Sequence, residues 1–254
     1  MSYARFVQGL FRLSLIGFAT VLAIYAAMIA LIAWPAPLFS HERTGGALTF
    51  HSDVPLPPSA EVMGREVTAL LAASPLGPPE EVHVWLVEDG LALRLFFAGS
   101  PRASGLTYPV ASLDNIFLRH ADFDRNRLVR AGQALPPPRT LSYYIVHEAT
   151  HLQLSRYAGR FAVPRIPRWI NEGFADYVAL GPATPDMVAR ASQGRPLPRE
   201  AFGSYPQERV CVTLALERLA GDLDALLALR NEMGADGACP LVPQFGIAPV
   251  GAAT

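Results

Sequence analysis

The feature that most restricts the fold of this chain is an uninterrupted apolar stretch near its N-terminus. Residues 13–34 read LSLIGFATVLAIYAAMIALIAW and contain no charged residue. Inside a bilayer every backbone N–H and C=O has to be bonded within the protein, so a single stretch of this kind must be helical. At about 1.5 Å of rise per residue it is long enough to cross the roughly 30 Å hydrocarbon layer. We therefore predict a transmembrane anchor over residues 13–34.

A cleaved signal peptide is the alternative interpretation of this stretch. The apolar region of a signal peptide typically runs for only about 7–15 residues. The sequence WPAP at 34–37 is also a poor cleavage site because of its prolines. A buried core helix fits less well, because the stretch is apolar on every face. We therefore expect the helix to be retained as an anchor.

The charges beside the stretch indicate its orientation. Arg5 and Arg12 precede it on the short N-terminal side. An excess of arginine on one side of a membrane helix marks the cytoplasmic side. The expected protein is a single-pass protein of the cell (inner) membrane, with a cytoplasmic N-terminus and a periplasmic or extracellular domain after about Pro35.

The overall charge excludes one class of partner. The chain has 21 Lys and Arg residues against 22 Asp and Glu residues, for a formal net charge of −1, and 51% of its residues are hydrophobic. This composition favours a large core, and no basic stripe is present. Nucleic acid is therefore not an expected partner, and nothing in the sequence indicates an oligomeric state.

The two cysteines, Cys211 and Cys239, do not form a C-x-x-C pattern. Zinc-finger and thioredoxin-like sites are therefore not supported. Outside the cytosol the two can form one disulfide that ties the tail to a helix near Cys211. Two buried thiols are the alternative, and the predicted compartment favours the bridge.

The segments after the anchor change character about halfway along the chain. We expect residues 1–12 in the cytoplasm, a linker over 35–45 and one folded domain over 46–254, divided into a sheet-rich part (46–135) and a helical part (140–254). Alternating or β-branched stretches predict strands at 47–50, 82–87, 105–110 and 115–119, and a helix is expected from Ser59 to Leu71.

The helical part follows three consecutive prolines at 136–138, which cannot lie within a helix. Helical periodicity runs through 141–157, 167–180, 207–219 and 223–233. Strands followed by helices predict an α+β fold with a helical C-terminal part.

Residues 147–151 read HEATH, an H-E-x-x-H pattern formed by His147, Glu148 and His151. On a helix, positions i and i+4 lie on one face, so both imidazoles can reach a single ion. The carboxylate of Glu148 stands beside the first histidine, where it can act as a general base toward water.

A second pattern follows, since residues 169–177 read WINEGFADY. A catalytic zinc ion takes three protein ligands and leaves one position open, and Glu172 offers the missing oxygen. Asp176 lies four residues later on the same helical face, where it can accept a hydrogen bond from a ligating histidine. Pro167 suits the first turn of this helix.

Together the two patterns resemble the gluzincin metallopeptidases, most closely the small, membrane-tethered, peptidase-MA-like kind. This resemblance implies a zincin-like fold, a Zn²⁺ cofactor and hydrolysis of a peptide or protein substrate. It assigns His147, His151 and Glu172 as zinc ligands, Glu148 as the catalytic base and Asp176 as the support of a ligand histidine. The chain lacks a G-x-M-E-N-like segment, so the free N-terminus recognition of aminopeptidase-N-like enzymes is not expected.

Gluzincins usually add a tyrosine or histidine that donates to the oxyanion. By analogy we expect Tyr205, just before a helix that begins near Pro206, to take this role, with Tyr157 and Tyr177 as alternatives. His83 and His120 occur in strand patterns, where a histidine is more often a packed or surface residue, and we leave them out of the metal site.

Two other functions fit the same residues. One is a membrane-anchored binding or scaffold protein that keeps the zincin fold without catalysis. The other is a zinc amidase that acts on cell-wall material. The intact base and the three intact ligands favour the peptidase.

Overall fold

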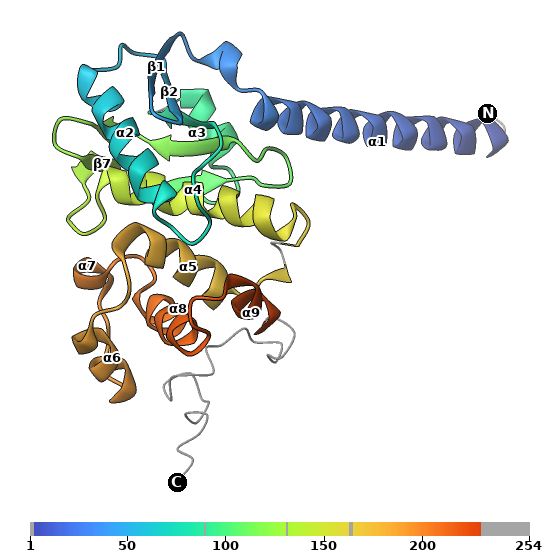
Figure 1. Cartoon of the computed structure of the whole chain (residues 1–254). Coiled ribbons are helices and arrows are strands. Elements are labelled where there is room, and N and C mark those ends of the chain that lie inside the picture. Colours follow the sequence, from blue (N-terminus) through green and yellow to red (C-terminus); the bar gives the residue numbers. More distant parts are fainter. Residues whose placement is uncertain (1–2, 89, 131, 163–164, 230–254) are drawn as a thin grey trace.

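The predicted α+β fold is confirmed by a computed structural model, which describes residues 3–88, 90–130, 132–162 and 165–229, with side chains from residue 11 onward. An N-terminal apolar helix precedes a mixed five-stranded sheet, and a helical part containing His147 and His151 follows (Figure 1). The predicted helical residues 230–233 and Cys239 lie outside the described residues, so the predicted disulfide is not tested.

Helix α1 (Tyr3–Ala33) extends away from the rest of the molecule (Figure 1). Its segment Phe11–Ala33 is 23 residues long, apolar and almost entirely exposed, which makes it the one helix in the described chain that can cross a membrane by length and composition. An anchor and a signal sequence both have these properties. A short 3₁₀ turn, η1 (Ala36–Leu38), follows α1.

The five-stranded sheet has the order β1-β2-β3-β5-β4. Its strands are β1 (His41–Gly45), β2 (Leu48–Ser52), β3 (Val82–Val87), β4 (Gly105–Thr107) and β5 (Asn115–Arg119). The three central strands are parallel, and the edge strands β1 and β4 are antiparallel to their neighbours. Strand β1 lies largely in the segment 35–45, which was expected to be a linker. No strand was predicted there, because this polar and mostly exposed edge strand lacks apolar alternation.

Helices cover both faces of the sheet. On one face, α2 (Pro58–Ala72) and α4 (Leu141–Ala158) share a hydrophobic core with the central strands. On the other face, α3 (Gly90–Phe96) packs with aromatic side chains of the sheet. The sequence predicted no helix at α3, because its seven residues are too short to show a clear period.

A second, three-stranded sheet joins the main sheet to α4. Its strands are β6 (Ala121–Asp122), β7 (Arg127–Arg130) and β8 (Gln133–Ala134). Sequence analysis missed these strands, since runs of two to four residues carry no alternation pattern. The triple proline that follows is not helical, as expected, and leads directly into α4.

The helical part packs as a layer on α4 (Figure 1). It contains α5 (Arg168–Leu180), α6 (Pro185–Ser192), α7 (Arg199–Phe202), α8 (Pro206–Arg218) and α9 (Leu223–Ala228). Helices α5 and α8 approach closely at Gly173, where an added Cβ would lie 2.3 Å from the carbonyl oxygen of Glu208. A glycine after Glu172 is therefore needed for α8 to lie against α5.

The face of the sheet that packs against α3, which we call the outer face, also carries a pair of histidines. His51 Nε2 lies 3.0 Å from His83 Nδ1, and the His51 ring stacks on Trp85 with 3.8 Å between ring centroids. Burial lowers the pKa of His51 to about 4, and the neighbouring His83 adds to the effect. The folded chain therefore holds His51 in its neutral form.

We expect acid to destabilise the fold through His51. Between pH 6.5 and about 4, this histidine is protonated in the unfolded chain but neutral in the folded one, so the free energy of unfolding falls as the pH falls. Allowing for solvent at this partly covered ring, the loss by pH 5 is about 1 kcal/mol. Urea unfolding of the full chain in detergent at pH 7.5 and pH 5 measures it. The His51→Gln variant should lose less stability than the unaltered chain, and an equal loss in both would contradict the prediction.

Candidate metal centre

Helix α4 places His147, Glu148 and His151 at the centre of the molecule. Its N-terminus is capped by the Thr140 hydroxyl, which accepts a hydrogen bond from the backbone N–H of Tyr143. The helix is covered by the sheet on one side and by α5 on the other, so all three side chains are buried. The H-E-x-x-H spacing places both imidazoles on one helical face, as the sequence predicts.

Helix α5 brings Glu172 to the same point. His147 Nε2 lies 3.3 Å from His151 Nε2 and 3.3 Å from Glu172 Oε2. The third side of this triangle, from His151 Nε2 to Glu172 Oε2, is 3.6 Å. Within the described residues, these three are the group of histidine and acidic side chains that can hold a metal ion.

The donor triangle has the size that a tetrahedral ion requires. Ligand bonds of about 2.0–2.1 Å at tetrahedral angles place neighbouring donor atoms about 3.4 Å apart. Two facing imidazole nitrogens and a carboxylate oxygen are also the donor types that zinc and similar divalent ions accept. The residues present therefore fit a metal ion of this class.

The electrostatics of the centre favour a positive charge. Burial lowers the pKa of His147, but the contacts with Asp176 and Glu172 outweigh it and raise that pKa to about 10. Burial raises the pKa of Glu172, but the nearby His151 and His147 outweigh it and hold that pKa well below its usual range. The buried Asp176 and the largely covered Glu172 thus stabilise positive charge at this centre.

Further polar groups fix the two imidazole rings. His147 Nδ1 lies 3.0 Å from Asp176 Oδ1, although the ring N–H is not well aligned with that oxygen. His151 Nδ1 lies 3.1 Å from the side-chain oxygen of Asn171. Both contacts use the nitrogen that faces away from the donor triangle, so each leaves its Nε2 free to bind a metal ion.

Asp176 is fully buried and makes two more contacts. It accepts a hydrogen bond of 2.5 Å from the Tyr143 hydroxyl, and one of 2.7 Å from the backbone N–H of Tyr205. The same Tyr143 hydroxyl accepts a hydrogen bond from the backbone N–H of Ser204. One carboxylate thus links the His147 ring to the loop that carries Tyr205.

A cleft of about 350 Å³ opens at the donor triangle. One wall is formed by residues of the segment from Ser100 to Pro109, which includes β4, and Tyr205 and residues of α5 also line the cleft. Glu148 lies against the wall at Gly105, where an added Cβ would be 2.8 Å from Glu148 Oε1. Burial raises the pKa of Glu148, Glu172 adds to this, and the two histidines oppose it.

Of the three tyrosines considered from sequence, Tyr205 alone lines this cleft. Its ring stacks on that of His147 with 5.5 Å between centroids, and burial, with the Glu172 and Glu148 carboxylates, raises the pKa of its hydroxyl. Tyr157 is half exposed and donates to Asp224, while Tyr177 lines a different cavity between α2 and α5.

His83 and His120 lie outside the candidate centre. His83 contacts His51, and His120 Nδ1 lies 2.6 Å from Glu88 Oε1.

The sequence analysis assigned no role to three residues of the centre: Tyr143, Asn171 and Gly105. Tyr143 precedes His147 by four residues, so helical spacing could have placed it on the same face of the helix. Asn171 directly precedes Glu172, so its position in the sequence could have indicated that it lies near the centre. Gly105 carried no such signal, because its contact with Glu148 depends on the tertiary fold.

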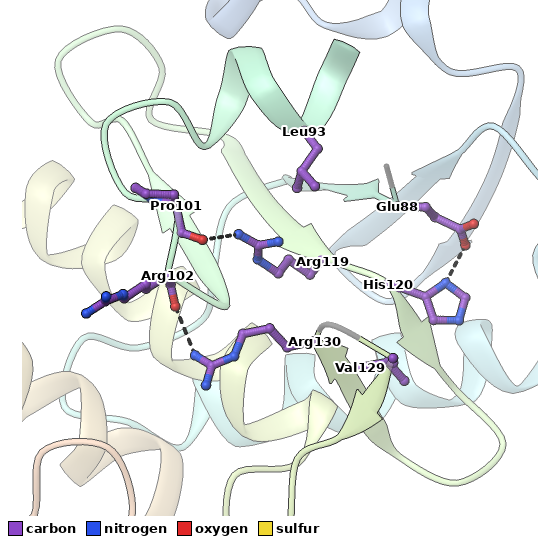
Figure 2. Close-up of a pocket in the computed structure, with 9 residues that line it drawn as sticks. Glu88, Leu93, Pro101, Arg102, Arg119, His120, Val129 and Arg130 are labelled. Atoms are coloured by element: carbon purple, nitrogen blue, oxygen red, sulfur yellow. Dashed lines mark hydrogen bonds and ion pairs between the residues drawn. The ribbon is translucent and has the colours of Figure 1, made fainter. Parts of the chain in front are cut away.

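A larger cavity of about 810 Å³ lies beyond the cleft wall (Figure 2). Arg119 donates to the carbonyl oxygens of Ala103 and Pro101, and Arg130 donates to that of Arg102. Three consecutive carbonyls of the wall are therefore bound by two guanidinium groups. These bonds hold an irregular segment in place between the cavity and the cleft.

Comparison with known proteins adds no family assignment. No model of a known protein family matches the chain, and no curated protein matches it either. The interpretation of the centre therefore depends on the geometry and chemistry of its own residues.

Gly105 offers a test of the geometry. In Gly105→Ala, the new Cβ would lie 2.7 Å from Leu118 Cδ2, 2.8 Å from Glu148 Oε1 and 2.9 Å from Glu148 Cγ, so the Glu148 side chain has to shift. We expect any hydrolytic activity to fall at least about tenfold, while metal content and melting temperature change little. Gly99→Ala is the matched control, because an added Cβ there meets nothing within 4 Å. Equal activity in the two variants would contradict the placement of Glu148.

Proposed function

We propose that this chain is a membrane-anchored, zinc-dependent peptidase. The observation that carries the proposal is the triangle of His147 Nε2, His151 Nε2 and Glu172 Oε2, with a buried carboxylate beside it in an open cleft. The donor set is the two-histidine, one-glutamate set of catalytic zinc sites. The resemblance to gluzincins from the H-E-x-x-H and WINEGFADY patterns supports the same assignment.

His147, His151 and Glu172 would hold the zinc ion. When bound, zinc supplies Lewis acidity, which makes water nucleophilic near neutral pH and polarises a carbonyl oxygen. Asp176 and Asn171 hold the two imidazole rings in the orientation that directs Nε2 to the centre. The protein thereby keeps the ligand geometry fixed without help from the substrate.

Glu148 is the proposed general base. Its carboxylate accepts a proton from the water that attacks the peptide carbonyl, and returns this proton to the departing amine. A pKa raised by burial suits both steps, because it brings the carboxyl closer to the working pH. Its position against Gly105 fixes the side of the cleft from which the proton is transferred.

Tyr205 is the proposed donor to the carbonyl oxygen as negative charge develops there. Its raised pKa keeps the hydroxyl protonated at neutral pH. The guanidinium groups of Arg168 and Arg199 lie 5.3 Å and 5.4 Å from its ring centroid, the His147 ring stacks on it, and its backbone N–H donates to Asp176. The donor is therefore positioned before the substrate binds.

The cleft wall supports a peptide as the substrate. Strand β4 is at the edge of the five-stranded sheet, and all three of its residues line the cleft. An extended peptide can pair with an edge strand through its main chain, which places successive peptide bonds along the wall. This feature favours peptides over cell-wall amides that lack an extended main chain.

The anchor completes the proposal. Helix α1 would cross the inner membrane once, with the N-terminus in the cytoplasm and the catalytic domain on the periplasmic or extracellular side. Its length and apolar character support a membrane span, and the arginines that precede the apolar stretch support the orientation.

Two substitutions test the catalytic assignment. Glu148→Gln removes the base but no ligand, so we expect zinc to stay bound and hydrolysis of casein or of a peptide library to fall at least about 100-fold. Glu172→Ala removes a ligand and should lose both zinc and activity. Zinc content by elemental analysis and cleavage with and without a chelator measure the two effects in the purified full chain.

Glu88→Gln is the control, because it removes a partly exposed carboxylate that contacts His120 away from the cleft. Its activity and zinc content should equal those of the unaltered chain. Full activity in Glu148→Gln would contradict the mechanism and leave the metal site intact. Bound zinc without hydrolysis of any peptide would favour the scaffold function, and cleavage of cell-wall amides alone would favour the amidase.

A further inference from the structure

The last turns of α1 are built into the folded domain. Asn115, the first residue of β5, donates its side-chain N–H groups to the carbonyl oxygens of Ile32 and Ala33, at 2.8 Å and 3.2 Å. The Asn115 side-chain oxygen in turn accepts a hydrogen bond of 2.9 Å from the Trp85 indole. An amide of the sheet thus satisfies the carbonyls at the end of α1, which have no partner within the helix.

Apolar contacts fix the same turn. The side chain of Ile32 is only 7% exposed and belongs to the cluster on the outer face of the sheet, with Trp85, Phe96, Phe97 and Phe117. Beyond this turn, Phe39 packs on Trp85 with 5.1 Å between ring centroids. The segment after the helix is therefore attached to the sheet and does not act as a free linker.

The exposure of α1 shows where the domain begins to cover it. The exposed fraction is 58% at Tyr25, 36% at Met28 and 7% at Ile32. A hydrocarbon layer of roughly 30 Å requires about 20 helical residues. Since the uncharged run begins only at Leu13, after Arg12, a span of this length ends at the turn that the domain covers. Such a span would leave no residues of α1 to form a stalk between the bilayer and the domain.

Several large apolar side chains are exposed on the segments around this exit. Trp34, Val110 and Phe161 have exposed fractions of 72%, 55% and 71%, and we call them the membrane rim. Trp34 follows α1 directly, and Val110 lies between Tyr108 and Ala111, which pack on the cluster that holds Ile32.

Phe161 follows the C-terminal end of α4, on the same side of the domain. Arg156 of α4 pairs with Asp114, the residue before Asn115, so the end of this helix lies beside the segment that caps α1. Figure 1 shows the C-terminal end of α4 on the side from which α1 leaves the domain. Tryptophan and other large apolar residues at this level are typical of the membrane–water interface.

We propose that the domain rests directly on the bilayer that α1 spans, with the membrane rim in contact with the phospholipid headgroup layer. This inference rests on the proposed anchoring role of α1 and is independent of the peptidase chemistry. It makes α1 and the domain one rigid unit, which keeps the cleft at a fixed height above the membrane.

Tryptophan quenching tests the contact in the full chain. The chain has three tryptophans, and Trp85 and Trp169 are buried, so Trp34→Phe removes the exposed one. In that background, single Val110→Trp and Phe161→Trp variants report on the rim, and Val62→Trp on α2 is the control at an exposed site remote from the exit. Each variant is reconstituted in phosphatidylcholine vesicles with or without bromine atoms at carbons 6 and 7 of one acyl chain.

Brominated lipid should quench the added tryptophan at 110 and at 161 at least about twofold more than the one at 62, because shallow bromines reach only groups at the interface. Circular dichroism of each variant checks that it is folded. If the chain floats with the vesicles and either rim position is quenched no more than position 62, the contact is disproved while the anchor stands. If the chain does not float with the vesicles, both the anchor and the contact are disproved. Hydrolysis is not measured, so loss of the peptidase proposal leaves this test unaffected.

Discussion

The contact between Glu172 and the two imidazoles of α4 is the interaction on which the rest of the structure depends. A largely covered carboxylate is costly unless a positive charge faces it, and Glu172 faces the two imidazoles, where a metal ion can supply that charge. The contact also fixes how α5 lies on α4. Glycine at 173, the next residue, then allows α8 to lie against α5, so ligand placement and helix packing are decided by neighbouring positions.

The remaining parts of the fold support this contact from two sides. The sheet holds α4 from one side, and its edge strand β4 brings Gly105 against Glu148. The helical part holds α4 from the other side, and Asp176 ties the His147 ring to the loop of Tyr205. The proposed base and the proposed oxyanion donor therefore line one cleft, each positioned by the elements that also surround the candidate metal centre.

Local spacing in the sequence predicted the parts of the site that lie on single helices. The i, i+4 relation placed His147 and His151 on one face, and the WINEGFADY pattern identified Glu172 and Asp176 on one helix. The fold class was predicted from the change in periodicity near the triple proline. Strands β6 to β8 are too short to show a period, and β1 is a polar edge, so neither was predicted. The bond from Asn115 to Ile32 joins residues 83 positions apart, and no local pattern can indicate such a contact.

The most direct test of the account is the coordination of zinc in the purified full chain. X-ray absorption at the zinc edge reports the ligand atoms and their distances without any need for activity. We predict about one zinc ion per chain, with nitrogen and oxygen neighbours at about 2.0–2.1 Å and the outer-shell scattering of two imidazoles. A zinc content near zero, or a zinc shell without imidazole scattering, would contradict the convergence of His147, His151 and Glu172 on one ion.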